Sequence, residues 1–143
     1  MDQNADLLNY IYQNSQMGIS TTKQLENVTG DSDFSTQLHS QRREYTKVNR
    51  KAAKMLHQYG HTEQGLSRMT QTSSTMTIGA KTLLDRSPSH ISDMMIQGST
   101  RGIIDMTRQM KRHPYANFEI LRLADHLVRL EQSNIEELKY YLS

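Results

Sequence analysis

Apolar side chains recur at helical spacing along most of this 143-residue sequence. In residues 34–59 they follow steps of three, four and seven, and only Gln41 interrupts the row. The same spacing runs through residues 66–84, 91–112 and 117–142, and more weakly through residues 5–27. Strand signals are weak because β-branched runs are few and no Asn-Gly turn occurs. This periodicity is typical of amphipathic helices, so the sequence predicts an all-α protein.

Short breaks separate these segments. Gly30 and Gly60 each follow a periodic run and suit the position after a helix, where φ is positive. Ser87-Pro88 is typical of an N-cap followed by proline at the first helical position, and His113-Pro114 ends a segment. Sustained apolar spacing with short turns favours antiparallel helices packed as a bundle.

The length of the segments limits how they can be connected. One helix over residues 66–110 would be roughly 68 Å long, against about 33–40 Å for its neighbours. Ser87-Pro88 is therefore expected to reverse the chain, with residues 62–86 crossing over along the bundle. Residues 5–27 and 34–59 then form one hairpin, and residues 91–112 and 117–142 the second. We expect a ferritin-like up-down bundle with an additional crossover helix, in a single domain over residues 1–143.

Composition narrows the class of protein. The net charge is +2, charged residues make up 22%, and cysteine is absent, which removes disulfides and thiolate chemistry. The charge-free stretches at residues 7–22 and 69–80 have 16 and 12 residues, both below the roughly 20 apolar residues of a membrane span. The start of the sequence has no signal-peptide pattern. These features predict a cytoplasmic protein without a membrane span.

Short motifs are spread over nearly the whole chain. They are Leu7-Leu8-Asn9, Met17-Gly18-Ile19, Gln41-Arg42-Arg43-Glu44-Tyr45, Leu56 with Gly60, Met95-Ile96-Gln97-Gly98-Ser99, and Glu131. This pattern resembles the small bacterial ferritin-like proteins of uncharacterised function. The resemblance implies a four-helix bundle with a helix-1 glycine, an acidic-aromatic pair in helix 2 and a Gly-Glu pair in the third bundle helix.

The metal ligands of such bundles are mostly missing from this sequence. A di-iron carboxylate site takes one Glu from each of two helices and Glu-x-x-His from each of the other two. Here Glu44 is followed by Lys47, and Glu131 is followed by Asn134. Ser99 stands where the resembled pattern has glutamate. We therefore expect no metal or other cofactor, with Glu44 and Glu131 as the remaining weak ligand candidates.

Glu131 lies within the apolar row of the last helix, four residues after Leu127 and seven before Leu138. A buried carboxyl group must be paired, hydrogen-bonded or protonated. The sequence predicts a buried polar layer that fixes the helix register, made of Ser15, Gln41, Ser99, Glu131 and Asn134. The alternative is a remnant or altered ligand site.

Two further features concern surfaces. A basic stripe, defined as Arg43, Lys47, Arg50 and Lys54, lies almost opposite the apolar row of residues 34–59. It is interpreted as a solvated face, with phosphate contact as the alternative. Gly98-x-x-x-Gly102 permits close approach of another helix, either within the bundle or from a second copy.

Together these features predict a non-catalytic bundle that is a structural or protein-interaction module and self-associates. One alternative is a metal-binding ferritin-like oxidoreductase or iron-storage protein. The other is a nucleic-acid-binding bundle that uses the basic stripe. A homo-oligomer or a protein partner is expected; nucleic acid is the less favoured partner.

Overall fold

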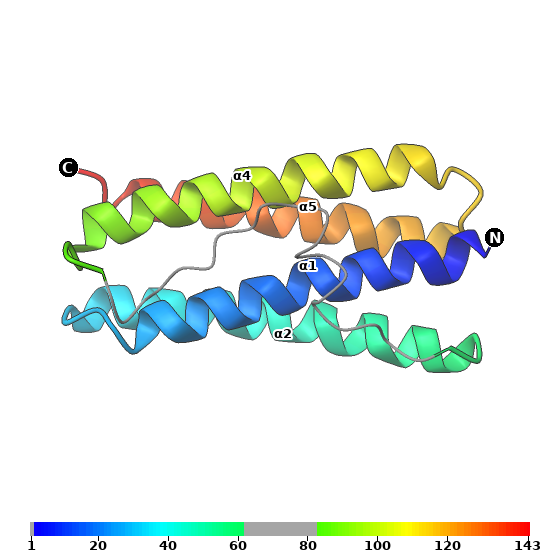
Figure 1. The fold of residues 1–143 in the computed structure, drawn as a ribbon, viewed down its shortest axis with the longest axis horizontal. Coiled ribbons are helices and arrows are strands. Elements are labelled where there is room, and N and C mark those ends of the chain that lie inside the picture. The colour runs from blue at the N-terminus through cyan, green and yellow to red at the C-terminus, as the bar shows by residue number, and fades with distance from the viewer. Residues whose placement is uncertain (1, 62–82) are drawn as a thin grey trace.

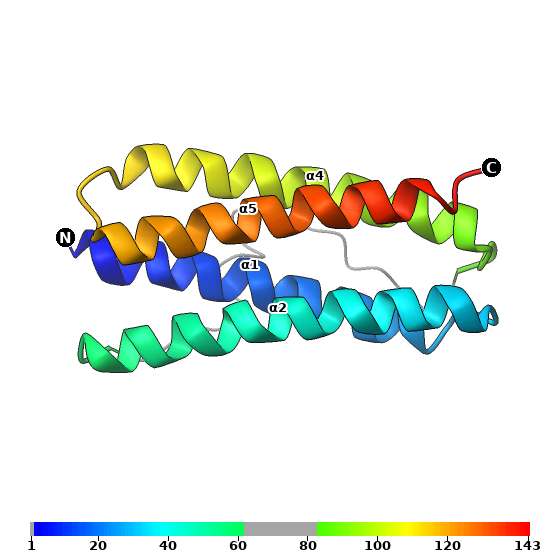
Figure 2. The same ribbon diagram turned by 180° about the vertical axis from the view of Figure 1, so that it is seen from behind.

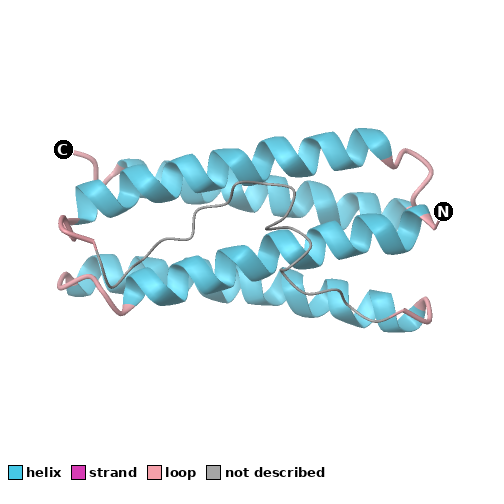
Figure 3. Ribbon diagram, viewed as in Figure 1, coloured by secondary structure: helices cyan, strands magenta, loops and turns pink. Residues whose placement is uncertain are grey.

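A computed structural model describes residues 2–61 and 83–143. It contains four helices, α1 (Gln3–Glu26), α2 (Ser32–Gln58), α4 (Pro88–Arg112) and α5 (Phe118–Lys139), and the described residues form no strand (Figures 1 and 3). The all-α prediction is confirmed, and each helix begins and ends within a few residues of its predicted bounds. Most of the expected crossover helix, residues 62–82, lies outside the described residues, and residues 83–87 are irregular rather than helical.

The helices pair as two antiparallel hairpins, α1 with α2 and α4 with α5, packed side by side into a bundle (Figures 1 and 2). At one end of the bundle, the Tyr59 hydroxyl donates to Glu119 Oε1 at 2.9 Å, and the Asn117 backbone N–H donates to Asn4 Oδ1 at 2.7 Å. We call this the Tyr59 end. It holds the start of α1, the end of α2 and the start of α5.

The opposite end of the bundle is closed by aromatic and terminal contacts. The Phe34 and Tyr141 rings pack edge to face with centroids 4.7 Å apart, and the Ser143 N–H donates to Ser89 Oγ at 3.0 Å. We call this the Phe34 end. Because α2 begins here and ends at the Tyr59 end, while α4 also begins here, α2 and α4 run in the same direction (Figure 1).

Local signals place the helix ends. Asp31 caps α2 by accepting from the Phe34 N–H at 2.9 Å, and Ser87 caps α4 by accepting from the His90 N–H at 3.2 Å, with Pro88 next. Gly60 has a φ of 77°, as predicted for the residue after α2. Gly30 does not have the predicted positive φ. The turn after α1 closes earlier, because the N–H groups of Val28 and Thr29 both donate to Leu25 O.

The apolar core has two parts. The larger cluster lies toward the Tyr59 end and contains Ala5, Leu7, Leu8, Ile11, Tyr45, Val48, Ala52, Met55, Leu56, Met106, Ala116, Ile120, Leu123, Ala124 and Leu127. The smaller cluster lies toward the Phe34 end and contains Leu25, Phe34, Leu38, Ile91, Met95 and Leu138. Each helix contributes to both clusters, so the bundle is held together along most of its length.

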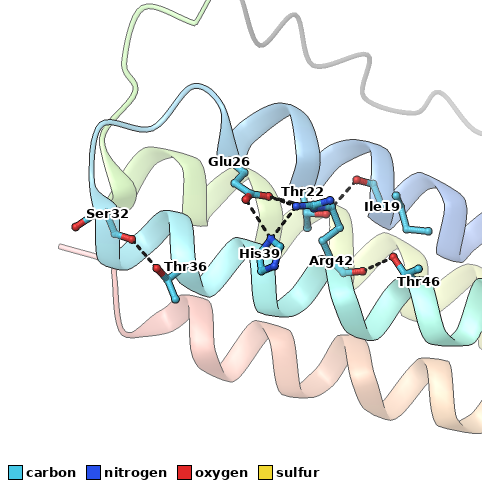
Figure 4. Close-up of polar contacts among 8 residues, drawn as sticks. All are labelled: Ile19, Thr22, Glu26, Ser32, Thr36, His39, Arg42 and Thr46. Carbon is cyan, nitrogen blue, oxygen red and sulfur yellow. Dashed lines mark hydrogen bonds and ion pairs between the residues drawn. The ribbon is translucent and has the colours of Figure 1, made fainter.

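A surface network joins the end of α1 to α2 near the Phe34 end (Figure 4). Arg42 Nη2 lies 3.0 Å from Glu26 Oε2, and His39 Nδ1 lies 3.3 Å from Glu26 Oε1. These partly exposed ion pairs add little stability individually, but they fix how the first hairpin closes.

Among the described residues, no helix combines the length and apolarity needed to cross a membrane.

Candidate functional site: a buried polar layer beside a pocket

The five residues of the predicted polar layer are all buried at mid-bundle. Along α2, Gln41 lies between Leu38 of the smaller cluster and Tyr45 of the larger one. Along α5, Glu131 and Asn134 lie between Leu127 and Leu138 in the same way. The polar layer therefore separates the two apolar clusters.

Glu131 is the titratable centre of this layer, with only 3% of its surface exposed. Burial raises the pKa of its carboxyl group to about 8, and the negative charge of Asp105 adds to this effect. The nearby Tyr45 hydroxyl, which is hydrogen-bonded to the carboxyl group, and the Asn14 amide act in the opposite direction. The carboxyl group is therefore mostly protonated, and neutral, at pH 7.

The Tyr45 hydroxyl donates to Glu131 Oε2 at 3.0 Å, across from α2 to α5. Burial, followed by the nearby Glu131 charge, raises the pKa of Tyr45 well above its ordinary value, so the phenol keeps its proton. The sequence placed Tyr45 in an apolar row and did not predict this bond. The ring does belong to the larger cluster, and only its hydroxyl reaches into the polar layer.

Two helical glycines make room for this pair. A Cβ atom on Gly18 of α1 would lie 2.5 Å from the Tyr45 ring. A Cβ atom on Gly102 of α4 would lie 2.5 Å from Glu131 Oε2 and 2.9 Å from Oε1. Gly102 therefore serves a contact inside the bundle, which is one of the two roles considered for the Gly98-x-x-x-Gly102 motif.

Two other predicted members of the layer bond to backbone oxygens. The Ser15 hydroxyl lies 2.8 Å from Ile11 O and 3.0 Å from Tyr12 O of its own helix. Gln41 Nε2 donates to the backbone oxygen of Asn134 at 3.4 Å. A hydroxyl or amide in a helix can bond to nearby backbone as readily as to a distant side chain, so spacing alone does not select its partner.

Two asparagines that the sequence did not single out also belong to this region. Asn14 Nδ2 donates to Gly102 O at 3.1 Å and ties α1 to α4. Asn49 Nδ2 lies 3.1 Å from Tyr12 O and 3.2 Å from Ser15 Oγ, which ties α2 to α1. The available signal was the amphipathic pattern itself, because each asparagine falls close to the boundary of an apolar stripe.

A pocket of about 330 Å³ lies beside the layer, between α1 and α4. Tyr45 and Glu131 form part of its wall from the buried side. Three small residues of α4 open the space: Gly98, Ser99 and Gly102. Glu131 Oε1, a buried atom, has no hydrogen-bond partner among the described residues.

The donor set does not fit the di-metal centre that a ferritin-like bundle would imply. Glu44, one of the two remaining candidates, is half exposed and lies 2.8 Å from the ammonium of Lys47. Glu131 is buried and faces the neutral groups Tyr45 and Asn14 instead of a second interior carboxylate or a histidine. The described residues hold no group of three or more histidine or acidic side chains that could bind a metal ion.

All four residues of the basic stripe are exposed on the outer side of α2. Lys47 pairs with Glu44, whereas Arg43, Arg50 and Lys54 form no ion pair with an acidic residue in the described part of the chain. The stripe is separate from the polar layer, which faces inward from the same helix.

Comparisons with protein-family models, with curated proteins and with solved structures found no match to this chain. Its assignment is therefore a four-helix, all-α bundle, without a family.

Proposed function

We propose that this chain is a non-catalytic bundle that works as an interaction module and self-associates through its ends. The observation that carries the proposal is where large apolar side chains are exposed. In the described residues these are Leu84, Ile104, Tyr115, Phe118, Tyr140 and Leu142. All except Ile104 lie at the two ends of the bundle, in turns and tails or, for Phe118, at the first residue of α5, so the described long faces expose few large apolar side chains.

Of the two ends, the Tyr59 end has the surface better suited to protein–protein contact. Tyr115 is 85% exposed and Phe118 is 74% exposed, on either side of the start of α5. The Arg122 guanidinium lies over the Phe118 ring, 5.7 Å from its centroid. Aromatic residues and arginine are enriched in the energetically important parts of protein interfaces, because they bury a large area at low entropic cost.

The interior supports a structural role for the polar layer. Glu131 is a neutral acid hydrogen-bonded by Tyr45, and Gly18 and Gly102 each accommodate one member of this pair. Such a fitted polar contact disfavours any other register between α2 and α5, because a shifted helix would leave these groups buried without partners.

We infer that the fold is ferritin-like, as the sequence motifs suggest. The supporting feature is the parallel direction of α2 and α4, which requires one long connection between two antiparallel hairpins. In such a scheme the expected crossover segment would make that connection.

Light scattering coupled to gel filtration tests the interaction proposal. Over about 10–500 µM, the range where modest interfaces form, we expect the wild-type mass to rise above 16.5 kDa. The double variant Tyr115→Ser/Phe118→Ser should remain at the monomer mass with an unchanged circular dichroism spectrum. Ile104→Ser is the matched control, because it removes an exposed apolar side chain from a long face. A wild-type protein that stays monomeric over this range would contradict the proposal.

Nucleic-acid binding is the second candidate, and the observation that favours it is the exposed basic stripe on α2, in which Arg43, Arg50 and Lys54 form no ion pair among the described residues. Phosphate contacts exchange for released counterions, so weak binding should disappear by about 150 mM salt. Sub-micromolar binding that survives this salt and is lost when the stripe is neutralised would make this the better function.

A ferritin-like oxidoreductase or iron-storage function has less support, because it would have to use Glu44 and Glu131 together. Metal analysis of the purified protein separates this alternative from the interaction module. Two tightly bound metal ions per chain would overturn the non-catalytic proposal.

A further inference from the structure

Four buried side-chain atoms lack a hydrogen-bond partner among the described residues: Gln41 Oε1, Ser92 Oγ, Asn134 Nδ2 and Glu131 Oε1. Of these residues, only Glu131 lines the pocket between α1 and α4, and Oε1 is its unpartnered atom. A buried polar atom without a partner costs free energy, and native structures keep few of them. The hydrogen bond from Tyr45 accounts for the position of Oε2. It does not account for Oε1, which has no hydrogen-bond partner among the described residues.

The carboxyl oxygens of the pocket wall favour a hydrogen-bond donor, because Glu131 is mostly neutral at pH 7 and Asp105 lies beside Arg101. The wall contains two acids, Glu131 and Asp105, and one base, Arg101. Arg101 is half exposed, and its Nε lies 3.6 Å from Asp105 Oδ1, so its charge is directed to that partner. The α1 and α2 residues in the wall are uncharged at neutral pH. An anion entering this pocket would meet carboxyl oxygens, whereas an N–H donor would satisfy the free one.

The size and the remaining surface of the pocket limit the ligand. About 330 Å³ is at the small end of ligand-binding sites. The thioether side chains of Met17 and Met95 supply an adaptable apolar wall opposite the acids. A short alkyl chain with a terminal amino group matches both parts of this surface.

We propose that the pocket binds a small primary alkylammonium ion, whose N–H donates to Glu131 Oε1 and whose alkyl chain packs against Met17 and Met95. This binding site is independent of the end contacts proposed above, so either proposal can fail without the other. No bond is made or broken in the ligand.

Binding changes the protonation of one group. The neutral Glu131 acid loses its proton to solvent as the carboxylate forms a hydrogen-bonded ion pair with the ammonium, which keeps its own proton. Among the described residues, the other titratable or charged groups of the wall are Tyr45 on α2 and Asp105 and Arg101 on α4, and α1 contributes none. Because the pKa of Glu131 is about 8, roughly 0.9 proton per bound ligand should be released at pH 7.

Isothermal titration calorimetry with n-butylammonium chloride tests the proposal on the full chain, in two buffers of different ionisation enthalpy. We expect saturable binding with a Kd in the millimolar range, on the order of 10 mM or below, because so small a ligand has few atoms that can contribute affinity. Binding should tighten about tenfold between about pH 6.5 and 7.5, and the heats in the two buffers should differ by the enthalpy of the released proton. 1-Butanol, which has the same chain length and no charge, should bind at least about tenfold more weakly.

Two variants complete the test. Glu131→Gln keeps the size of the side chain but removes the charge, and should weaken n-butylammonium binding at least about tenfold. Glu136→Gln is the matched control, because Glu136 is an exposed acid of the same helix, paired with Lys139 at 3.0 Å, and its loss should leave binding unchanged. The proposal is wrong if wild-type protein shows no saturable heat, if Glu131→Gln binds as well as wild type, or if 1-butanol binds equally well.

Discussion

The polar layer and the apolar clusters on either side of it are built by different rules. In the smaller cluster, Phe34, Leu38 and Leu138 are fully buried and contact one another through nonspecific apolar packing. In the polar layer, Glu131 and Tyr45 meet through one directed hydrogen bond, with Gly102 behind the first and Gly18 behind the second. The clusters tolerate any side chains of suitable volume, whereas the layer depends on particular atoms.

This difference separates stability from specificity. Burial of apolar surface supplies most of the free energy that holds the bundle together, at roughly 25 cal/mol per Å². The polar layer contributes little net free energy, but it penalises helix registers that leave Glu131 unpaired. Substitutions in the two regions should therefore change the free energy of unfolding by different amounts, with a different pH dependence and with different additivity.

The largest effect is expected in the smaller cluster. Phe34→Ala should lower the free energy of unfolding by about 4 kcal/mol, because it removes a buried ring and leaves a cavity beside Tyr141. The loss should be the same at pH 5 and pH 8, since the cluster contains no acid or base. Urea unfolding at both pH values measures it. A loss below about 1 kcal/mol would mean that this end of the bundle adds little stability.

A smaller loss is expected where a glycine meets the polar pair. Gly18→Ala should cost about 2 kcal/mol, because the new Cβ would lie 2.5 Å from the Tyr45 ring and the ring must shift. Gly30→Ala is the matched control, since nothing lies within 4 Å of a Cβ atom there, and should change stability by less than about 0.5 kcal/mol.

A double-mutant cycle locates the cause of the Gly18 effect. In a Tyr45→Leu background the cost of Gly18→Ala should fall below about 1 kcal/mol, because the contacting ring is gone. If the cost is the same in both backgrounds, Gly18 does not act through Tyr45.

Most substitutions in a protein core lower the free energy of unfolding, but removing the charge of Glu131 should raise it. A raised acid pKa means that the folded protein binds the proton more tightly than the unfolded chain, for which the pKa is about 4.5. The contribution of Glu131 to the stability is therefore most favourable below pH 4.5 and falls as the pH rises toward 8, by up to about 1.4 kcal/mol per pH unit.

Glu131→Gln removes this titration. We expect the variant to be more stable than wild type by about 3 kcal/mol at pH 7, with the gain growing toward pH 8 and vanishing near pH 4. Urea unfolding across this range measures the difference between the two proteins. A variant that loses more than about 2 kcal/mol at pH 7 would mean that the carboxyl group is a paired anion.

The smallest effect is expected on the outside of α2. Replacing Arg43, Lys47, Arg50 and Lys54 with Gln should change the free energy of unfolding by less than about 0.5 kcal/mol per site, because all four side chains are exposed. Thermal unfolding of the four single variants checks this. A larger loss at Lys47 alone would show that its contact with Glu44 is stronger than a surface ion pair.

The sequence alone determined the helices and which face of each one is buried. A helix turns by a fixed angle per residue, so the spacing of apolar residues assigns a face without knowledge of any neighbour. The ends were also readable, because Asp31, Ser87 and Gly60 act on backbone groups only a few residues away. For the same reason, the spacing placed Glu131 and Asn134 on the buried face of α5.

Only the tertiary structure decided which atoms meet inside the bundle. It paired Glu131 with Tyr45 rather than with Ser15, placed Gly18 and Gly102 behind that pair, and opened the pocket between α1 and α4. These contacts join residues up to 88 positions apart, as between Asn14 and Gly102. They depend on the rotation and axial shift of each helix against the others. Those quantities come from packing all four helices at once, and no local spacing rule contains them.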